Sequence, residues 1–195
     1  ELLGLANSRD GQGRYLFAGF QDGAAPFSDT AAGVVYNGDQ GRPAMAVSGS
    51  REMAASDHGH SIFELGRSGN GVFKTAAAAS NTGGGVASVG LVYDAALLTG
   101  HSYRLEFSGG SPPTYSVLDV TAGTTLSSGN IYTSGTAISF DGLELSVEGA
   151  PAAGDRVDVT PSKNQSIFKT LSDAIAMTST PFTGAAGSAR YATRL

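Results

Sequence analysis

Residues 137–177 read AISFDGLELSVEGAPAAGDRVDVTPSKNQSIFKTLSDAIAM, and this stretch contains the transition that organises the fold. Asp141-Gly142 separates two alternating apolar segments, 138–140 and 143–145. An Asp-Gly pair in that position predicts a β-hairpin, because a type I′ turn needs a positive φ at both central residues. Val157 and Val159 repeat the period of two, which predicts another strand.

The second half of the stretch has the pattern of an amphipathic helix. Ser162 and Gln165 have capping-box spacing, in which two side chains bind unpaired backbone N–H groups at a helix start. Pro181 is expected to bound the helix, because proline moves the preceding residue out of the α region. Residues at helical spacing then follow: Ile167, Phe168, Leu171, Ala174, Ile175 and Thr178. The sequence therefore predicts a β-rich body that passes into a helix at about residue 162.

Composition narrows the class of protein. The 195 residues include 28 glycines and are 41% hydrophobic, which suits a real core built from short strands and many turns. The net charge of −5 is spread along the chain and argues against a nucleic-acid partner, which would need clustered Lys and Arg. The lack of cysteine excludes disulfides, thiolate catalysis and Cys-ligated metal. No apolar run approaches the ~20 residues that span a bilayer.

The remaining segments predict short strands framed by helical ends. Residues 1–9 have the pattern of the last turns of a helix, which ends at residues 10–13. The next residues, 14–19, are predicted to form a strand. Residues 66–85 are rich in Gly, Ala and Ser, which predicts a loop. A short helical turn is predicted at residues 94–98. Further strands are expected at 34–36, 86–92, 103–107, 115–117 and 131–132, and weaker ones within 43–63.

Together these elements predict an α+β fold that is mostly β. We expect an antiparallel β-sandwich or barrel-like domain, residues 41–160, inserted into a helical base formed by both chain ends, residues 1–40 and 161–195. Because both ends have helical patterns that stop abruptly, we expect a piece from the middle of a longer protein. The residues expected to bury the base, each contributing about 1.5–3 kcal/mol when fully buried, are Leu2, Leu5, Phe168, Leu171 and Ile175.

The chain offers few candidates for chemistry. His58 and His60 follow an aspartate closely enough for a metal site, and His101 is a distant third histidine. The intervening glycine favours a solvated loop there. The sequence has no G-x-S-x-G nucleophile elbow, and its glycine clusters at 69–71 and 83–85 lack the register of a phosphate-binding loop. We therefore predict no catalytic, cofactor-binding or metal-binding residues.

Two further groups of residues have both a functional and a structural interpretation. Asp155 and Asp158 lie near Glu148 and could act as paired carboxylates, but period-two strands place such residues on solvent-exposed faces. Three tyrosines could line a glycan site, although half-buried strand positions explain them better: Tyr103, Tyr115 and Tyr132.

Several motifs resemble those of a known family. Residues 11–19 (GQGRYLFAG), after LLGLAN at 2–7, resemble the segment of flagellin-like axial proteins where a long N-terminal helix ends and a β-hairpin begins. Four pieces resemble the flagellar hook-associated protein 3 family, the hook–filament junction (FlgL) proteins: Pro26-Phe27, YNGDQG at 36–41, Ile62-Phe63 and Gly71-Val72-Phe73. Within 137–177, Gly149-x-Pro151 and Gly154-Asp155 resemble a block shared with hook-associated protein 1.

The resemblance implies a structural role in the bacterial flagellum, without catalysis or cofactors. Proteins of this family are exported through the flagellar type III channel without a cleaved signal, and they form a ring between hook-associated protein 1 and the flagellin filament. The resemblance therefore implies an extracellular location at the hook–filament junction, self-association through terminal helices missing here, and an export chaperone. It implies no nucleic-acid or membrane partner. We expect this piece to be monomeric, with its β-rich domain facing solvent.

Other interpretations are open from the sequence. Hook-associated protein 1 and flagellin are alternatives within the same class of axial proteins. A carbohydrate-binding or adhesive β module is an alternative from another class, and it would use Tyr103 or Tyr132. An enzyme is the third, and it would need a deep pocket with convergent side chains of shifted pKa.

Overall fold

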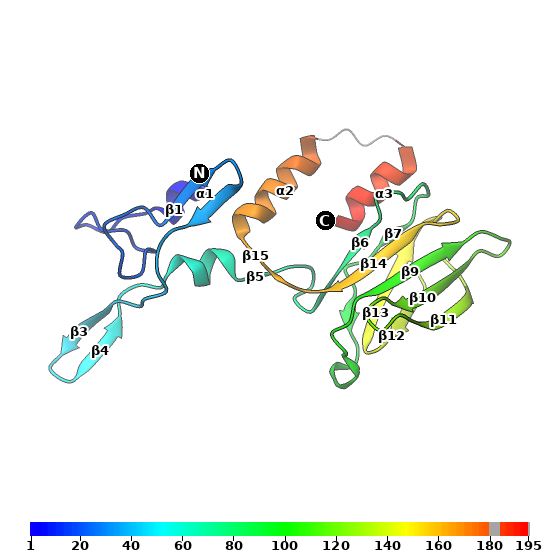
Figure 1. The fold of residues 1–195 in the computed structure, drawn as a ribbon, viewed down its shortest axis with the longest axis horizontal. Helices are drawn as coiled ribbons and strands as arrows, with labels where there is room; N and C mark the ends of the chain where they lie inside the picture. The colour runs from blue at the N-terminus through cyan, green and yellow to red at the C-terminus, as the bar shows by residue number, and fades with distance from the viewer. Residues whose placement is uncertain (180–183, 195) are drawn as a thin grey trace. The chain divides into compact units, whose positions relative to one another are not determined.

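The computed structural model describes residues 1–179 and 184–194, and Figure 1 labels its elements. The chain divides into two compact units. Unit 1 contains Glu1–Gly66 and Asn164–Ser179, whereas unit 2 contains Arg67–Lys163 and the C-terminal segment. Unit 2 is therefore largely an insertion between two parts of unit 1.

Unit 2 is built on two antiparallel sheets. The order of the first is β11-β10-β9-β14-β6, and that of the second is β12-β13-β7, with β8 also paired to β13. The strands are β6 (Phe73–Ala77), β7 (Val86–Ala87), β8 (Leu91–Val92), β9 (Tyr103–Ser108), β10 (Thr114–Asp119), β11 (Thr124–Ile131), β12 (Ala137–Phe140), β13 (Leu143–Glu148) and β14 (Arg156–Pro161). A 3₁₀ turn, η2 (Ala95–Leu97), confirms the short helical turn predicted at 94–98.

Alternating burial along the strands explains why the two sheets pack together. In β9 and β13 every second residue is buried, and the residues between them are half-exposed. This is the pattern expected of sheets with one face in the core and one in solvent. The core joins both sheets and includes Tyr103, Leu105, Phe107, Val157, Val159, Leu143, Leu145 and Val147. The predicted mostly-β sandwich is confirmed.

The hairpin at Asp141-Gly142 is confirmed. Phe140 faces Leu143 across the turn, and the central residues have φ values of 42° and 79°. Asp141 is the one non-glycine residue with positive φ in the described part of the chain. Aspartate tolerates that conformation better than most residues, which explains why it stands here.

Unit 1 contains two β-hairpins and two α-helices. Its elements are α1 (Leu2–Ala6), β1 (Phe27–Thr30), β2 (Gly33–Tyr36), β3 (Ala44–Ser48), β4 (Arg51–Ala54), the π-helical turn η1 (His60–Glu64) and α2 (Ile167–Ser179). β1 pairs with β2 and β3 with β4, both antiparallel. β5 (Gly66–Arg67) and β15 (Asn164–Gln165) pair where the chain passes between the units.

The core of unit 1 is an aromatic cluster around Phe27. Its ring centroid lies 5.0 Å from that of Tyr36 and 5.2 Å from those of Phe63 and Phe168. Ala6 of α1 is fully buried in the same cluster. Residues from α1 and α2, which are far apart in the sequence, therefore share one apolar core, as an inserted-domain topology requires.

The N-terminal segment departs from the sequence prediction. Residues 14–19 form turns rather than a strand, and only Tyr15 makes an isolated β-bridge, to Arg9. The backbone N–H of Tyr15 donates to the carbonyl of Asp22, and that of Leu16 to Ser8. The segment's hydrogen bonds thus go to scattered partners instead of one neighbouring strand.

The start of α2 is also corrected. The helix begins at Ile167, and Ser166 Oγ accepts the N–H of Phe168 at 3.2 Å. Ser162 does not cap it, because its hydroxyl donates to the carbonyl of Ser68 at 2.6 Å. The predicted boundary at Pro181 lies outside the described residues.

Two parts of the chain group differently from the sequence prediction. Residues 41–66, expected in the β-rich domain, belong to unit 1, because Phe63 packs into its aromatic core. The C-terminal helix α3 (Gly184–Arg194), expected in the helical base, packs on β6 and β7 of unit 2 (Figure 1). There Thr193 Oγ1 accepts the N–H of Ala87 at 3.1 Å. β6 itself lies within the predicted loop 66–85.

Candidate assembly surfaces

One aromatic side chain, Phe168, packs α2 against the rest of unit 1. The ring of Phe168 lies 5.2 Å from that of Phe27 and 5.7 Å from that of Phe63, centroid to centroid. The helix contacts β2 and η1. Aromatic pairs at these distances add about 0.5–1.5 kcal/mol beyond the area they bury. Phe168 therefore sets the position of the helix on unit 1.

A second face of α2 carries an apolar stripe that the described chain leaves exposed. Ile167, Leu171 and Ile175 follow each other at intervals of four residues, and Leu171 and Ile175 expose 46% and 65% of their surface. A stripe with this spacing fits against another helix or into an apolar groove. None of the described helices is both long and apolar enough to cross a membrane.

The five residues expected to bury the helical base divide into two groups. Leu2 and Phe168 pack against the core of unit 1, as expected. Leu5, Leu171 and Ile175 are exposed, so their predicted burial is wrong for the described chain. The physical reason is that Leu171 and Ile175 lie on a face of α2 that does not pack into the aromatic core of unit 1 in the described part of the chain.

His58 is buried at 9% exposure, which corrects the prediction of a solvated loop. Its Nδ1 accepts the backbone N–H of Ser61 at 3.2 Å, and its ring stacks on that of His60. His60 Nδ1 lies 2.6 Å from Glu64 Oε2. These contacts hold the π-helical turn that brings Phe63 into the core. Within residues 1–179 and 184–194, no three His, Asp or Glu side chains converge on a possible metal position.

Asp155 is also buried rather than solvent-facing, with 2% of its surface exposed. Its carboxylate accepts three backbone N–H groups, from Thr82 at 2.8 Å, Gly83 at 3.0 Å and Ala152 at 2.9 Å. It therefore joins two loops of unit 2. Asp158 pairs instead with Arg104 at 2.8 Å on the sheet surface, so the two aspartates do not act as a carboxylate pair.

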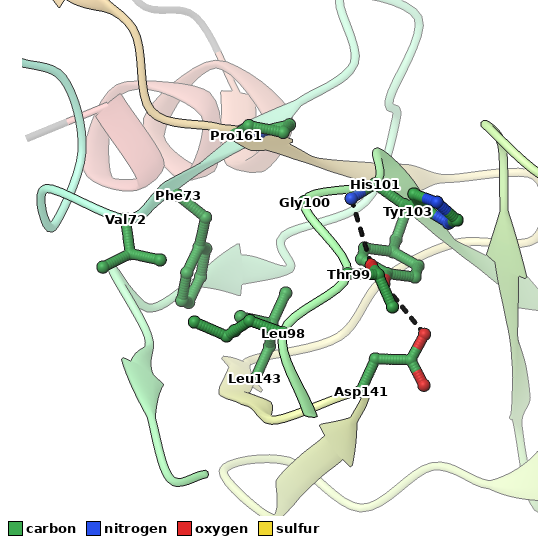
Figure 2. A pocket seen from close by; sticks show the side chains of 10 residues that line it. All are labelled: Val72, Phe73, Leu98, Thr99, Gly100, His101, Tyr103, Asp141, Leu143 and Pro161. Carbon is green, nitrogen blue, oxygen red and sulfur yellow. Dashed lines mark hydrogen bonds between the residues drawn. The ribbon is translucent and has the colours of Figure 1, made fainter. Parts of the chain in front are cut away.

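Unit 2 contains a shallow hollow of about 100 Å³ (Figure 2). Phe73, Leu98 and Leu143 form its apolar wall. Opposite them, the hydroxyl of Tyr103 donates to Asp141 Oδ2 at 2.8 Å. Burial raises the pKa of Tyr103 to about 12, so its phenol stays protonated near neutral pH. The hollow is well below the ~300 Å³ of a typical small-molecule site.

Two of the three tyrosines that suggested a glycan site lie too deep to stack on a sugar. Tyr103 is 1% exposed and Tyr132 8%. The hydroxyl of Tyr132 lies 3.0 Å from the carbonyl of Val147 and 2.8 Å from that of Gly149. Tyr115 is half-buried in β10, as predicted. The two tyrosines that the carbohydrate-binding alternative depends on are therefore core residues.

Two exposed features of unit 1 are not among the predicted site residues. The hairpin β3–β4 pairs Met45 with Met53 and leaves both side chains and Val47 exposed. The hairpin lies within residues 43–63, where the weak alternation of the sequence predicted short strands. Phe20 exposes 69% of its surface, and no local pattern separates it from a core phenylalanine.

Comparison with known proteins finds similarity to flagellar hook-associated proteins. Residues 76–161 match the family model described as "Flagellar hook-associated protein 1, D2-like domain". The flagellar hook-associated protein 3 of Salmonella typhimurium is 41% identical over 63 residues, which are 32% of this chain and 19% of that protein.

The comparison of structures covers almost the whole chain. The crystal structure of the flagellar junction protein FlgL from Legionella pneumophila is similar over 98% of this chain and 65% of that one, with a TM-score of 0.88 and 32% identity. Along almost its whole length the chain is therefore similar to flagellar hook-associated protein 3. The crystal structure of FlgL from Xanthomonas campestris is similar over 99% of this chain and 64% of that one, with a TM-score of 0.88 and 33% identity.

All of these relatives are flagellar proteins. It spans less than two thirds of the solved FlgL chains, and its aligned part is about a fifth of the Salmonella protein. The match to a hook-associated protein 1 domain covers most of unit 2, which agrees with the block of sequence that the two families share.

Proposed function

We propose that this chain is part of an adapter that joins the flagellar hook to the filament, between hook-associated protein 1 and flagellin. The observation that carries the proposal is the likeness to a flagellar junction protein over 98% of the chain at 32% identity. In this role the protein works outside the cell, after export through the flagellar type III channel with the help of a chaperone. It binds neither nucleic acid nor membrane, and it catalyses no reaction.

The proposed mechanism of assembly is the packing of α2 against a partner helix. Phe168 fixes the helix to unit 1, and the stripe of Ile167, Leu171 and Ile175 faces away for a partner helix. Each of these side chains contributes about 1.5–3 kcal/mol when a partner buries it fully. The partner we propose is the set of terminal helices through which hook-associated protein 3 assembles into a ring. The piece alone is monomeric in dilute solution.

A graft tests the proposal. Residues 1–195 replace the corresponding segment of FlgL in a flagellated host, so that the host's own terminal segments remain. We expect the graft to restore swimming and to keep filaments attached to cells. A matched graft carrying Leu171→Asp and Ile175→Asp should be exported yet release its filaments into the medium. A graft that is exported and folded but never retains filaments would overturn the proposal.

Hook-associated protein 1 is the second candidate, because residues 76–161 match a domain model of that protein. The same graft distinguishes the two. It should function in the segment of the junction protein and fail in the corresponding segment of hook-associated protein 1. The reverse result would favour the second candidate.

A further inference from the structure

We propose that Met45 and Met53 form an oxidation site, at which a peroxide converts both thioethers to sulfoxides and thereby opens the hairpin β3–β4. The inference goes beyond the proposed function and does not depend on it. It rests on three observations. Both methionines are exposed, they face each other across the hairpin, and the hairpin buries none of its residues.

The thioethers are the main targets in this chain for two-electron oxidation. The sequence has no cysteine and no tryptophan, and it has three methionines. Two of the three lie in the hairpin, where Met45 exposes 58% of its surface and Met53 54%. The third, Met177 on α2, is half-buried. Because an oxidant reaches an exposed sulfur more easily, the hairpin pair should react before Met177.

The two methionines form the main side-chain contact between the strands. Met45 lies directly opposite Met53 in the antiparallel pair. Residues in that position have Cβ atoms ~4.5–5.5 Å apart and share one face. The other three pairs are Ala44 with Ala54, Ala46 with Glu52, and Ser48 with Arg51. Val47 falls at the register shift and has no residue opposite, so the methionines are the one pair of large apolar side chains in this hairpin.

No buried residue of the hairpin could compensate for the loss of this pair. All five residues of β3 and all four of β4 are exposed, and Figure 1 shows the two strands as an arm that extends from the rest of unit 1. A two-stranded hairpin by itself is marginally stable in water, so one cross-strand contact changes its open fraction measurably. Methionine commonly fills irregular gaps in a core, and these strands have no core to fill.

The reaction is the transfer of one oxygen atom. A lone pair of the methionine sulfur attacks one oxygen of hydrogen peroxide, the O–O bond breaks and an S=O bond forms. The other oxygen leaves as hydroxide and takes up the proton of the transferred oxygen, so water is the second product. The sulfur is oxidised by two electrons and the peroxide is reduced by two. The sulfoxide is polar, so it no longer makes an apolar contact across the strands.

Peroxide treatment of the 195-residue chain, followed by peptide mapping in a mass spectrometer, tests the site. We expect Met45 and Met53 to gain oxygen about threefold faster than Met177, or more. Trypsin cleavage after Arg51 in β4 measures opening, because proteolysis of a folded protein follows the population of its open form. That cleavage should become about twofold to fivefold faster after oxidation, whereas cleavage after the exposed Arg14 should keep its rate.

Matched variants separate oxidation of the pair from general damage. The double variant Met45→Leu and Met53→Leu keeps an apolar pair without sulfur, so peroxide should leave its cleavage after Arg51 unchanged. Met177→Leu should respond as the unsubstituted chain does. The double variant Met45→Gln and Met53→Gln makes the pair polar without an oxidant, so it should be cleaved faster from the start.

Three results would each overturn the proposal. The first is oxidation of Met45 and Met53 no faster than that of Met177. The second is unchanged cleavage after Arg51 once both sulfoxides have formed. The third is a response to peroxide that persists in the double leucine variant.

Discussion

Replacing Asp155 by alanine should destabilise unit 2 more than any surface substitution. The carboxylate is 2% exposed and accepts the N–H groups of Thr82, Gly83 and Ala152 at 2.8–3.0 Å. Removing it leaves three backbone donors without their acceptor. A buried donor left unpaired costs about 1–3 kcal/mol.

The three costs do not add in full, because water can enter an enlarged space and the loops can relax. We therefore expect Asp155→Ala to lower the free energy of unfolding by about 3–5 kcal/mol. Asp155→Asn keeps one carbonyl oxygen but presents an NH₂ group to at least one backbone donor, so its loss should be about half as large.

Denaturant unfolding followed by circular dichroism measures this effect. The chain has two compact units, so the transition of unit 2 has to be resolved from that of unit 1. Asp173→Ala is the matched control, because Asp173 forms an exposed pair with Lys169 on α2 and should change stability by less than about 0.5 kcal/mol. A loss below about 1 kcal/mol for Asp155→Ala would refute the view that this carboxylate holds the two loops together.

Three further predictions follow from the structure. Gly142→Ala should cost about 3 kcal/mol, because a Cβ would lie 2.2 Å from the Asp94 carbonyl oxygen at a φ of +79°. Gly129→Ala, at +67° with open space around it, should cost only about 1 kcal/mol, and equal losses in denaturant unfolding would contradict the steric argument. The pKa of Tyr103 is raised to about 12 by burial, so its contribution to stability is complete below pH 10 and is lost as pH rises toward 12. Tyr103→Phe should therefore flatten the alkaline decline in the free energy of unfolding, and an unchanged slope would contradict the assignment. Leu171→Asp should leave the stability of the isolated chain within about 0.5 kcal/mol, whereas Phe63→Ala should lower it by about 3–4 kcal/mol, as thermal or denaturant unfolding can show.

Local signals in the sequence were sufficient for much of the fold. The Asp141-Gly142 turn, the alternation of β9 and the helical periodicity of α2 depend on neighbouring residues, and all three are present in the structure. The strand-rich middle between helical patterns was also the basis for expecting an inserted domain. Such features are set by backbone geometry and by which side of an element is apolar.

The candidate surfaces were harder to predict, because they depend on partners distant in the sequence. The periodicity of α2 indicates that Leu171 lies on an apolar face. It does not show that α3, which was expected in the same helical base, packs on β6 and β7. Asp155 looked solvent-facing because its acceptor role depends on loops around residues 82 and 152. Ser162 and Ser166 are equally good caps by type, and only the contact with Ser68 decides between them.

The position of the protein on intact flagella tests the adapter role most directly. The graft in the FlgL of a flagellated host, carrying Leu126→Cys on the exposed edge of unit 2, can be labelled with a maleimide dye and viewed by fluorescence microscopy. The adapter role predicts a single spot at the cell-proximal end of each filament. Labelling along the whole filament, or none between hook and filament, would contradict it.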